Sequence, residues 1–176
     1  LTLSSNNIVN LLDIFDELGN LGYLDLSKNE IIQIPNSLCN LSKLTYLDVS
    51  NNQLSNIPSA FQNLTNLKWF HCTDNQIICL PDEFCNLNNL TQLNLDRNQI
   101  TNLPCNFIKL SNLKWLSLSD NLLPQDYAAI LKENNSSWEV LSESQSQIVF
   151  KENLPEKIKM NSLSDLSKYV QIQRST

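Results

Sequence analysis

Leucine and isoleucine recur along this chain with a fixed spacing of 23 residues. Written with x for a variable residue, the repeated unit is L-x-x-L-x-L-x-x-N-x-I-x-x-I-P-x-x-F-x-x-L-x-x. Its first position is the apolar column of Leu21, Leu44, Leu67, Leu90 and Leu113. Its ninth position is a polar column of Asn6, Asn29, Asn52, Asn75, Asn98 and Asn121. Self-similarity of this kind is typical of proteins built from stacked structural repeats.

Each unit carries the pattern of a short strand followed by a turn. The segment L-x-x-L-x-L alternates with period two, which predicts a strand with one buried face. The asparagine at position nine offers amide donors and an acceptor, so stacked asparagines can satisfy the backbone where the chain leaves the strand. Proline at position fifteen ends the strand ladder, and x-x-F-x-x-L after it predicts a short helical or extended segment. A single unit cannot bury its apolar face, but neighbours stacked about 4.8 Å apart can.

Six units align over residues 1–133. The first unit, from Leu1 to Asn20, is truncated, because Leu1 stands at the fourth position of the pattern. Four full units follow, at 21–43, 44–66, 67–89 and 90–112. The sixth unit begins at Leu113 and is degenerate after Asn121, as expected for a terminal unit that covers the end of a stack. The truncated start leads us to expect a fragment or a processed form of a longer chain.

Residues 134–176 break the period, and we assign them to a C-terminal cap or tail. Within and just before them the sequence predicts a short helix over 125–132 and a loop rich in Ser, Glu and Gln over 136–147. A strand is expected over 147–150, and apolar residues at helical spacing predict a helix over 161–171.

Positions three, five and seven of each strand should point away from the core, because side chains alternate between the two faces of a strand. Position three carries Tyr23, Tyr46, Trp69, Gln92 and Trp115. An outward strand face is ordinarily polar, whereas Tyr and Trp are enriched in binding hot spots. The column therefore predicts a protein-binding ridge. Cross-strand packing without a partner and coverage by the tail are the two alternatives.

Polar residues beside the aromatic column complete the candidate site. Asp25 and Asp48 form a local acidic edge suited to a basic or hydrogen-bonding partner. His71 lacks a second histidine or cysteine for a metal and a nucleophile for catalysis, so we interpret it as part of the binding face. The predicted partner-binding residues are Tyr23, Asp25, Tyr46, Asp48, Trp69, His71, Asn94, Arg97 and Trp115. With two glycines and no phosphate-loop or catalytic motif in the chain, we expect no enzyme activity, no metal and no cofactor.

Composition narrows the choice of partner and compartment. The net charge of −6 and pI near 4.7 argue against nucleic acid and anionic membranes, which attract clustered Lys and Arg. Apolar runs are too short to span a bilayer, so no membrane insertion is expected. The five cysteines (Cys39, Cys72, Cys79, Cys85 and Cys105) contain no C-x-x-C pair. Free, mostly buried thiols in a reducing compartment are the simplest reading, which favours a cytoplasmic location.

These columns resemble the leucine-rich repeat family over residues 1–133. The 23-residue period with I/L-P-x-x-F/L is similar to the intracellular subtype found in Ras-pathway scaffolds, Scribble- and Erbin-like proteins and fungal adenylyl cyclases. The resemblance implies an α/β fold: a curved right-handed solenoid with a parallel sheet on its concave face. Short helical or extended segments would line the convex face, and the outward columns described above would lie on the concave one.

Three functions follow from this resemblance. The first is a protein–protein interaction module, a scaffold or signalling adaptor that holds a partner protein on the concave face. The second is the regulatory repeat array of a multidomain signalling enzyme, a phosphatase, kinase or cyclase whose catalytic domain lies elsewhere. The third is an extracellular receptor ectodomain, which would require bonded cysteines. The sequence does not name the partner.

Overall fold

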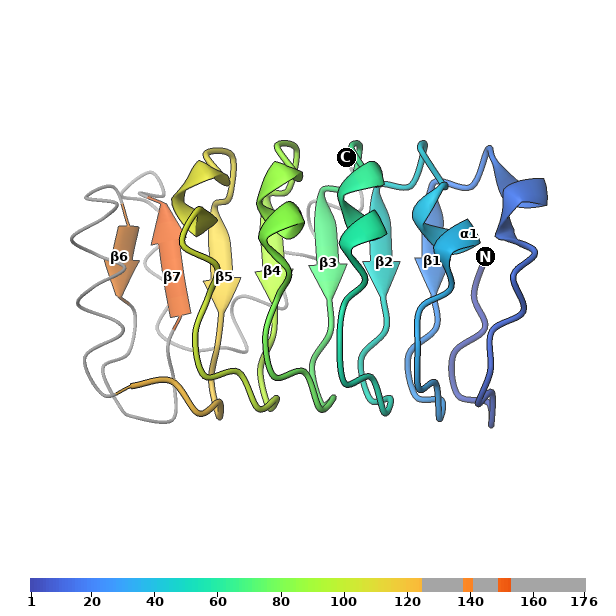
Figure 1. The fold of residues 1–176 in the computed structure, drawn as a ribbon, viewed down its shortest axis with the longest axis horizontal. Helices are drawn as coiled ribbons and strands as arrows, with labels where there is room; N and C mark the ends of the chain where they lie inside the picture. Colours follow the sequence, from blue (N-terminus) through green and yellow to red (C-terminus); the bar gives the residue numbers. More distant parts are fainter. Residues whose placement is uncertain (125–137, 141–148, 153–176) are drawn as a thin grey trace, which may run out of the picture.

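The computed structural model describes residues 1–124, 138–140 and 149–152. The strands are β1 (Tyr23–Asp25), β2 (Tyr46–Asp48), β3 (Trp69–His71), β4 (Gln92–Asn94), β5 (Trp115–Ser117), β6 (Trp138–Val140) and β7 (Val149–Glu152). The helical segments are η1 (Phe15–Leu18), α1 (Asn36–Cys39), η2 (Ser59–Asn63), η3 (Asp82–Asn86) and η4 (Phe107–Lys109). All of these helical segments except α1 are 3-10 turns. The strands form one side of the molecule and the helical segments the other (Figure 1).

Strands β1 to β5 make a parallel sheet in which every neighbour is displaced by one repeat. Tyr23 thus lies beside Tyr46, and Tyr46 beside Trp69. Thr2 forms an isolated parallel bridge to Asp25, so the truncated first unit joins the same sheet. The predicted parallel solenoid is therefore confirmed. We call the sheet face that carries positions three, five and seven the concave face.

The core lies between the sheet and the helical segments. Leucines at positions four and six of the interior strands, such as Leu24 and Leu26, have no exposed surface. Aromatic side chains from the helical segments reach the sheet: the ring of Phe61 lies 4.8 Å from Phe70 and 5.8 Å from Phe84. Because each unit contributes to the same core, apolar burial ties every repeat to its neighbours.

The asparagine column is built into the backbone of the solenoid. Asn52 donates from Nδ2 to the carbonyl oxygens of Val49 (2.9 Å), Ser50 (3.2 Å) and, one unit earlier, Leu26 (3.1 Å). Its Oδ1 accepts from the backbone N–H of Ile31 at 2.9 Å. The same set of bonds is made by Asn29, Asn75, Asn98 and Asn121. The predicted asparagine ladder is confirmed, and each rung from Asn29 to Asn121 joins two units.

The residue before each asparagine adopts a left-handed backbone conformation that the sequence pattern did not predict. At position eight φ lies between 49° and 59° in Ser5, Lys28, Asn51, Asp74, Arg97 and Asp120. No glycine occupies the column, although glycine adopts this conformation most readily. Three of the six are Asn or Asp, which tolerate it better than other side chains, and this was the available signal. The conformation turns the chain out of the strand and places these side chains along one rim of the concave face.

The end of the sheet departs from the expected tail. The loop expected over 136–147 contains strand β6, and the strand expected over 147–150 is β7, which begins and ends two residues later. β7 pairs antiparallel with β5, and β6 pairs antiparallel with β7. An uncovered edge of β5 would leave N–H and C=O groups without partners, which explains why a polar segment still forms strands here. The helices expected over 125–132 and 161–171 lie outside the described residues.

The ladder makes a direct prediction about stability. Asn52→Ala removes four hydrogen bonds and leaves buried backbone groups of two units unsatisfied, so the free energy of unfolding should fall by about 3 kcal/mol or more. Urea unfolding measures the loss. Asn56→Ala is the matched control, because Asn56 is exposed and its side chain bonds, among the described residues, only to Ser55 Oγ; it should cost less than about 0.5 kcal/mol. Equal losses in the two variants would contradict the proposed role of the ladder.

Candidate functional site

The aromatic column lies on the concave face, but its members are not equally exposed. Tyr23 has 40% of its surface exposed, and Trp69 and Trp115 are half-buried. Tyr46 is buried, with 7% exposed. The expectation that all four aromatic side chains present themselves to a partner is therefore wrong for Tyr46.

Tyr46 is buried because its neighbours on both sides pack against it. The Tyr23 and Tyr46 rings are stacked, with centroids 4.4 Å apart and an angle of 7° between their planes. His71 meets Tyr46 edge-on, with centroids 5.4 Å apart. Cross-strand packing, one of the alternatives for this column, thus describes the Tyr23–Tyr46–His71 stack. The two tryptophans and the outer face of Tyr23 are the aromatic surfaces left partly open on this face.

Acidic and amide side chains at position five accept hydrogen bonds from the protein's own backbone. Asp25 Oδ1 accepts from the N–H of Ser27 (3.0 Å) and from its Oγ (2.7 Å). Asp48 Oδ1 accepts from the N–H of Ser50 at 2.9 Å. Asn94 Oδ1 does the same for Asp96 at 3.1 Å. These side chains close the turn at the end of each strand, as Asp and Asn commonly do.

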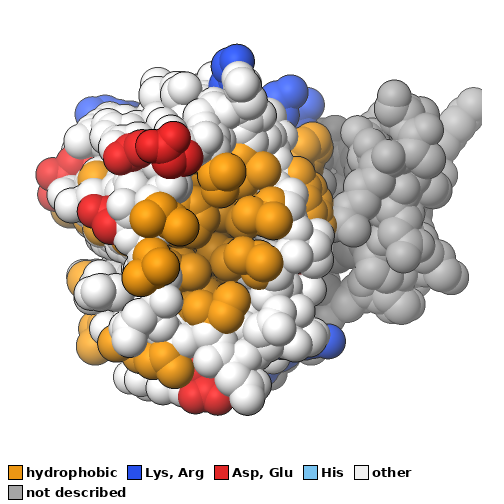
Figure 2. Space-filling view, turned by 90° about the vertical axis from the view of Figure 1, so that its right-hand side faces the viewer, with side chains coloured by type: hydrophobic (Ala, Val, Ile, Leu, Met, Phe, Trp, Pro, Cys, Tyr) orange, Lys and Arg blue, Asp and Glu red, His pale blue; other side chains and the backbone are white. Residues whose placement is uncertain are grey.

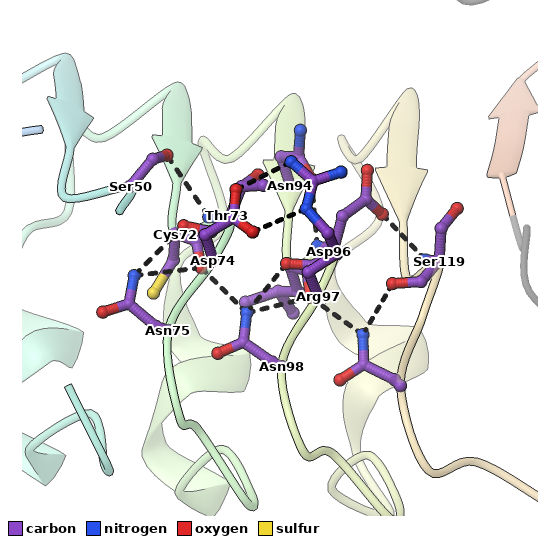
Figure 3. A network of polar contacts seen from close by, with 12 residues as sticks. Ser50, Cys72, Thr73, Asp74, Asn75, Asn94, Asp96, Arg97, Asn98 and Ser119 are labelled. Carbon is purple, nitrogen blue, oxygen red and sulfur yellow. Dashed lines mark hydrogen bonds and ion pairs between the residues drawn. The ribbon is translucent and has the colours of Figure 1, made fainter. Parts of the chain in front are cut away.

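In the two units where position five holds His71 or Ser117, the N–H at position seven donates instead to a side-chain oxygen of the preceding unit. His71 occupies position five in the third full unit, and there the N–H of Thr73 donates to Ser50 Oγ at 3.2 Å. Ser117 occupies it in the last parallel strand, and there Asp96 Oδ1 accepts from the N–H of Ser119 at 2.7 Å. The concave columns are therefore hydrogen-bonded across units and hold a fixed surface, part of which is drawn in Figure 3.

Asp48 and His71 form a half-buried polar pair at the centre of the predicted site. His71 Nδ1 lies 3.8 Å from Asp48 Oδ2, and the Tyr46 hydroxyl donates to that same oxygen at 3.3 Å. Burial alone would raise the pKa of the Asp48 carboxyl. The contact with His71 and the hydrogen bonds from Ser50 outweigh burial and hold that pKa below its ordinary value.

Two further aspartates, which sequence reasoning missed, complete the polar network in Figure 3. Arg97 forms a two-pronged ion pair with Asp74 of the preceding unit, at 2.6 and 2.7 Å. These hydrogen bonds lower the pKa of Asp74. Burial raises the pKa of Asp96 in spite of hydrogen bonds from Ser117 and Ser119. An acid and a base at position eight of successive units was the signal that could have revealed the Asp74–Arg97 pair.

The predicted site residues therefore fall into three groups. Asp25, Asp48, His71 and Asn94 lie together at position five, on adjacent strands β1 to β4. The aromatic residues run beside them at position three. Arg97 lies at the rim, engaged by Asp74 rather than free for a partner.

Nothing in the described part of the chain resembles a catalytic or metal centre. No three His, Cys, Asp or Glu side chains among these residues gather to hold a metal ion. All five thiols are free; Cys79 and Cys105 are exposed and the other three are buried. Burial raises the pKa of Cys39 and of Cys85 to about 11, and that of Cys72 further, so none of the three is an activated nucleophile. Among the described residues no helix is long and apolar enough to cross a bilayer.

Comparisons with known proteins match the repeat pattern. A protein-family model described as "Leucine rich repeat" matches residues 1–54 and 57–100, more than half of the chain. No significant match occurs among curated protein sequences. A leucine-rich repeat protein of Leptospira interrogans has a similar solved structure, with 30% identity, a TM-score of 0.72 and 74% of this chain covered.

Two internalins of Listeria monocytogenes are also similar in structure. InlF has 32% identity and a TM-score of 0.59 over 68% of this chain, and internalin C2 has 34% and 0.63 over 70%. The matches cover 33% of the Leptospira chain, 34% of InlF and 52% of internalin C2. The chain thus spans about a third to a half of the length of these proteins.

The opposite pKa directions of Asp96 and Asp48 predict opposite effects of neutralising them. Since the folded-state pKa of Asp96 is raised, its charge costs stability once the pH rises through that pKa, and Asp96→Asn should increase the free energy of unfolding at neutral pH. The gain should vanish at acid pH, where the carboxyl is protonated in both states. Asn keeps a side-chain oxygen for Ser117 and Ser119.

Asp48→Asn is the matched control in the same urea-unfolding series from about pH 3 to about pH 7. Its pKa is lowered in the folded state, so this variant should lose stability at neutral pH, and the loss should shrink as the pH falls through the folded-state pKa. The same sign of change in both variants would contradict the burial argument for Asp96.

Proposed function

The chain belongs to the leucine-rich repeat family, and from that premise we propose that its concave face binds a partner protein. Repeat modules of this family typically present a protein-binding surface. The observation that carries the proposal is the pair of half-buried tryptophans, Trp69 and Trp115, on a sheet face where other side chains already close the turns at the strand ends. The fold does not require large amphipathic side chains there, whereas binding hot spots commonly use them.

The contacts on this face support a different role for each group of proposed binding residues. Trp69, Trp115 and the exposed ring of Tyr23 supply contact area. Tyr46 and His71 support the Tyr23 ring from within the stack, and the Asp48 carboxylate holds His71. Asp25 and Asn94 line the same face with oxygens that accept backbone hydrogen bonds and remain half-exposed. A face whose polar groups are already fixed loses little conformational entropy when a partner binds.

The proposed cellular role is a scaffold or signalling adaptor of the 23-residue intracellular subtype, located in the cytoplasm and without catalytic activity. The free thiols support a reducing compartment. The alternative role is that of a regulatory array, in which this solenoid regulates a catalytic domain elsewhere in a larger protein. It is supported by the fact that the chain matches only part of the length of the solved proteins.

Removing one tryptophan tests the binding proposal. Trp69→Ala should weaken capture of the bound protein by about 2 kcal/mol, or roughly 30-fold in Kd. Ile108→Ala is the matched control, because Ile108 is 55% exposed but lies in η4, on the opposite side from the sheet. Pulldown followed by titration calorimetry with the captured protein gives both values. Equal binding by the wild type and Trp69→Ala, with both folded by circular dichroism, would refute the proposal.

Thiol reactivity tests the proposed compartment. Titration of the denatured, unreduced protein should give five free thiols. In the native protein Cys79 and Cys105 should react rapidly, whereas Cys39, Cys72 and Cys85 should react only on unfolding, because burial protects them and raises their pKa. Fewer than five thiols in protein purified from its native source would point to disulfides and to the extracellular alternative.

A further inference from the structure

Polar side-chain atoms without a hydrogen-bond partner are concentrated on one part of the concave face. Among the described residues, the buried atoms of this kind all lie at position three or seven of the three adjacent units that contain β3, β4 and β5. A buried polar atom without a partner costs free energy, so such a cluster marks a place where a bound group would supply missing contacts. The atoms are Thr73 Oγ1, Gln92 Oε1, Trp115 Nε1 and Ser119 Oγ.

This polar cluster lies away from the apolar end of the solenoid. Figure 2 looks onto that end, where the first unit exposes hydrophobic side chains such as Leu12 and Ile14. The first unit joins the sheet through the bridge from Thr2 to β1, and two strand-to-strand steps separate β1 from β3. The polar cluster and the apolar end are therefore separate surfaces.

Asp96 lies in the middle of the cluster, at position seven of the unit that contains β4. Its backbone oxygen accepts from the N–H of Asp74 at 3.0 Å, and the N–H of Arg97 donates to Ser119 O at 2.8 Å. These bonds hold position seven of the three units side by side, so Thr73 and Ser119 flank Asp96 (Figure 3). Only 9% of Thr73 and 6% of Ser119 is exposed, and the hydroxyls of both have no partner. Two buried, unpartnered hydroxyls thus border the Asp96 carboxylate.

The two oxygens of the Asp96 carboxylate differ in what they bind. Oδ1 accepts from the Ser117 hydroxyl at 2.5 Å and from the Ser119 N–H at 2.7 Å. Oδ2 accepts no hydrogen bond from the described residues, and the side chain is half-exposed. An asparagine oxygen would accept the bonds of Oδ1, just as Asn94 Oδ1 accepts from the N–H of Asp96. The fold therefore uses one oxygen of Asp96 but not its negative charge.

Among the described side chains, no cation forms an ion pair with Asp96. The adjacent Arg97 makes its two-pronged ion pair with Asp74 instead. Asp120, at position eight of the next unit, is exposed and adds another carboxylate. Burial raises the pKa of Asp96, so its charge lowers the stability of the folded protein at neutral pH. A charge that destabilises the fold is explained if it serves binding.

We propose that Asp96 binds a basic side chain, arginine or lysine, of the protein that docks on the concave face. The proposal rests on the proposed function of this face and adds the chemistry of one contact. A guanidinium or ammonium group carries only hydrogen-bond donors, which suits the open Oδ2 and the hydroxyl oxygens that border it. Such a cation would also offset the free energy that burial of the carboxylate costs. A metal ion is less suited, because no three His, Cys, Asp or Glu side chains of the described residues gather there.

A library of random displayed peptides supplies the probe. Peptides are selected on the wild-type protein, and individual binders are synthesised and titrated by fluorescence anisotropy. We expect binders that carry arginine or lysine and that bind the Asp96→Asn variant about ten-fold or more weakly, because a charge-assisted hydrogen bond is lost. Asp82→Asn is the matched control, since it removes an equal charge from an exposed residue of η3, on the opposite side from the sheet, and should leave binding unchanged.

A mutant cycle assigns the contact to Asp96. Replacing the arginine of a binder by citrulline, or its lysine by acetyl-lysine, removes the charge. This change should weaken binding to the wild type about ten-fold and have little effect on binding to Asp96→Asn. The variant should stay folded, because it loses a destabilising charge and keeps an oxygen for Ser117 and Ser119, and urea unfolding measures this.

The possible results distinguish the Asp96 contact from the proposed function as a whole. Binders that Trp69→Ala weakens but Asp96→Asn does not would overturn the contact and leave the concave face as a binding surface. Binders that neither substitution weakens would contradict both proposals. Additive losses in the mutant cycle, or a selection that yields no binders, would also overturn the contact.

Discussion

The hydrogen bonds of the asparagine column are the constraint on which the rest of this solenoid depends. A chain that leaves a strand inside a stack carries buried N–H and C=O groups that no neighbouring strand can reach. Each asparagine from Asn29 to Asn121 satisfies such groups in its own unit and in the unit before it. These hydrogen bonds recur with the repeat period, directly after the left-handed turn at position eight, and join each unit to the one before it.

The ladder also explains why the concave face can be specialised. The asparagine side chain bonds to the backbone groups of the turn. Side chains at position five or seven accept hydrogen bonds from the backbone N–H at the strand end, as Asp48 and Ser50 do. The side chains at position three are then not needed as hydrogen-bond partners of the backbone. The tryptophans at this position cost the fold little and offer a partner large, rigid contact area.

The regular columns made most of the fold predictable, and the exceptions fall where columns interact. Period, strand positions, inward leucines and the asparagine ladder follow from residue type and spacing alone. The burial of Tyr46 does not, because it results from contacts with Tyr23 and His71 on neighbouring strands. Likewise the backbone bonds of Asp25 and Asp48 depend on turn geometry, and the antiparallel pairing of β6 with β7 follows from no column of the repeat.

If the concave face binds the partner protein, the partner lies against the tryptophan column. Photo-cross-linking locates the contact, with benzoylphenylalanine placed at Trp69 in one variant and at Ile108, on the opposite side, in another. We expect a cross-linked partner from the position of Trp69 and none from that of Ile108. A partner captured from the position of Ile108 but not from that of Trp69 would contradict binding by the concave face.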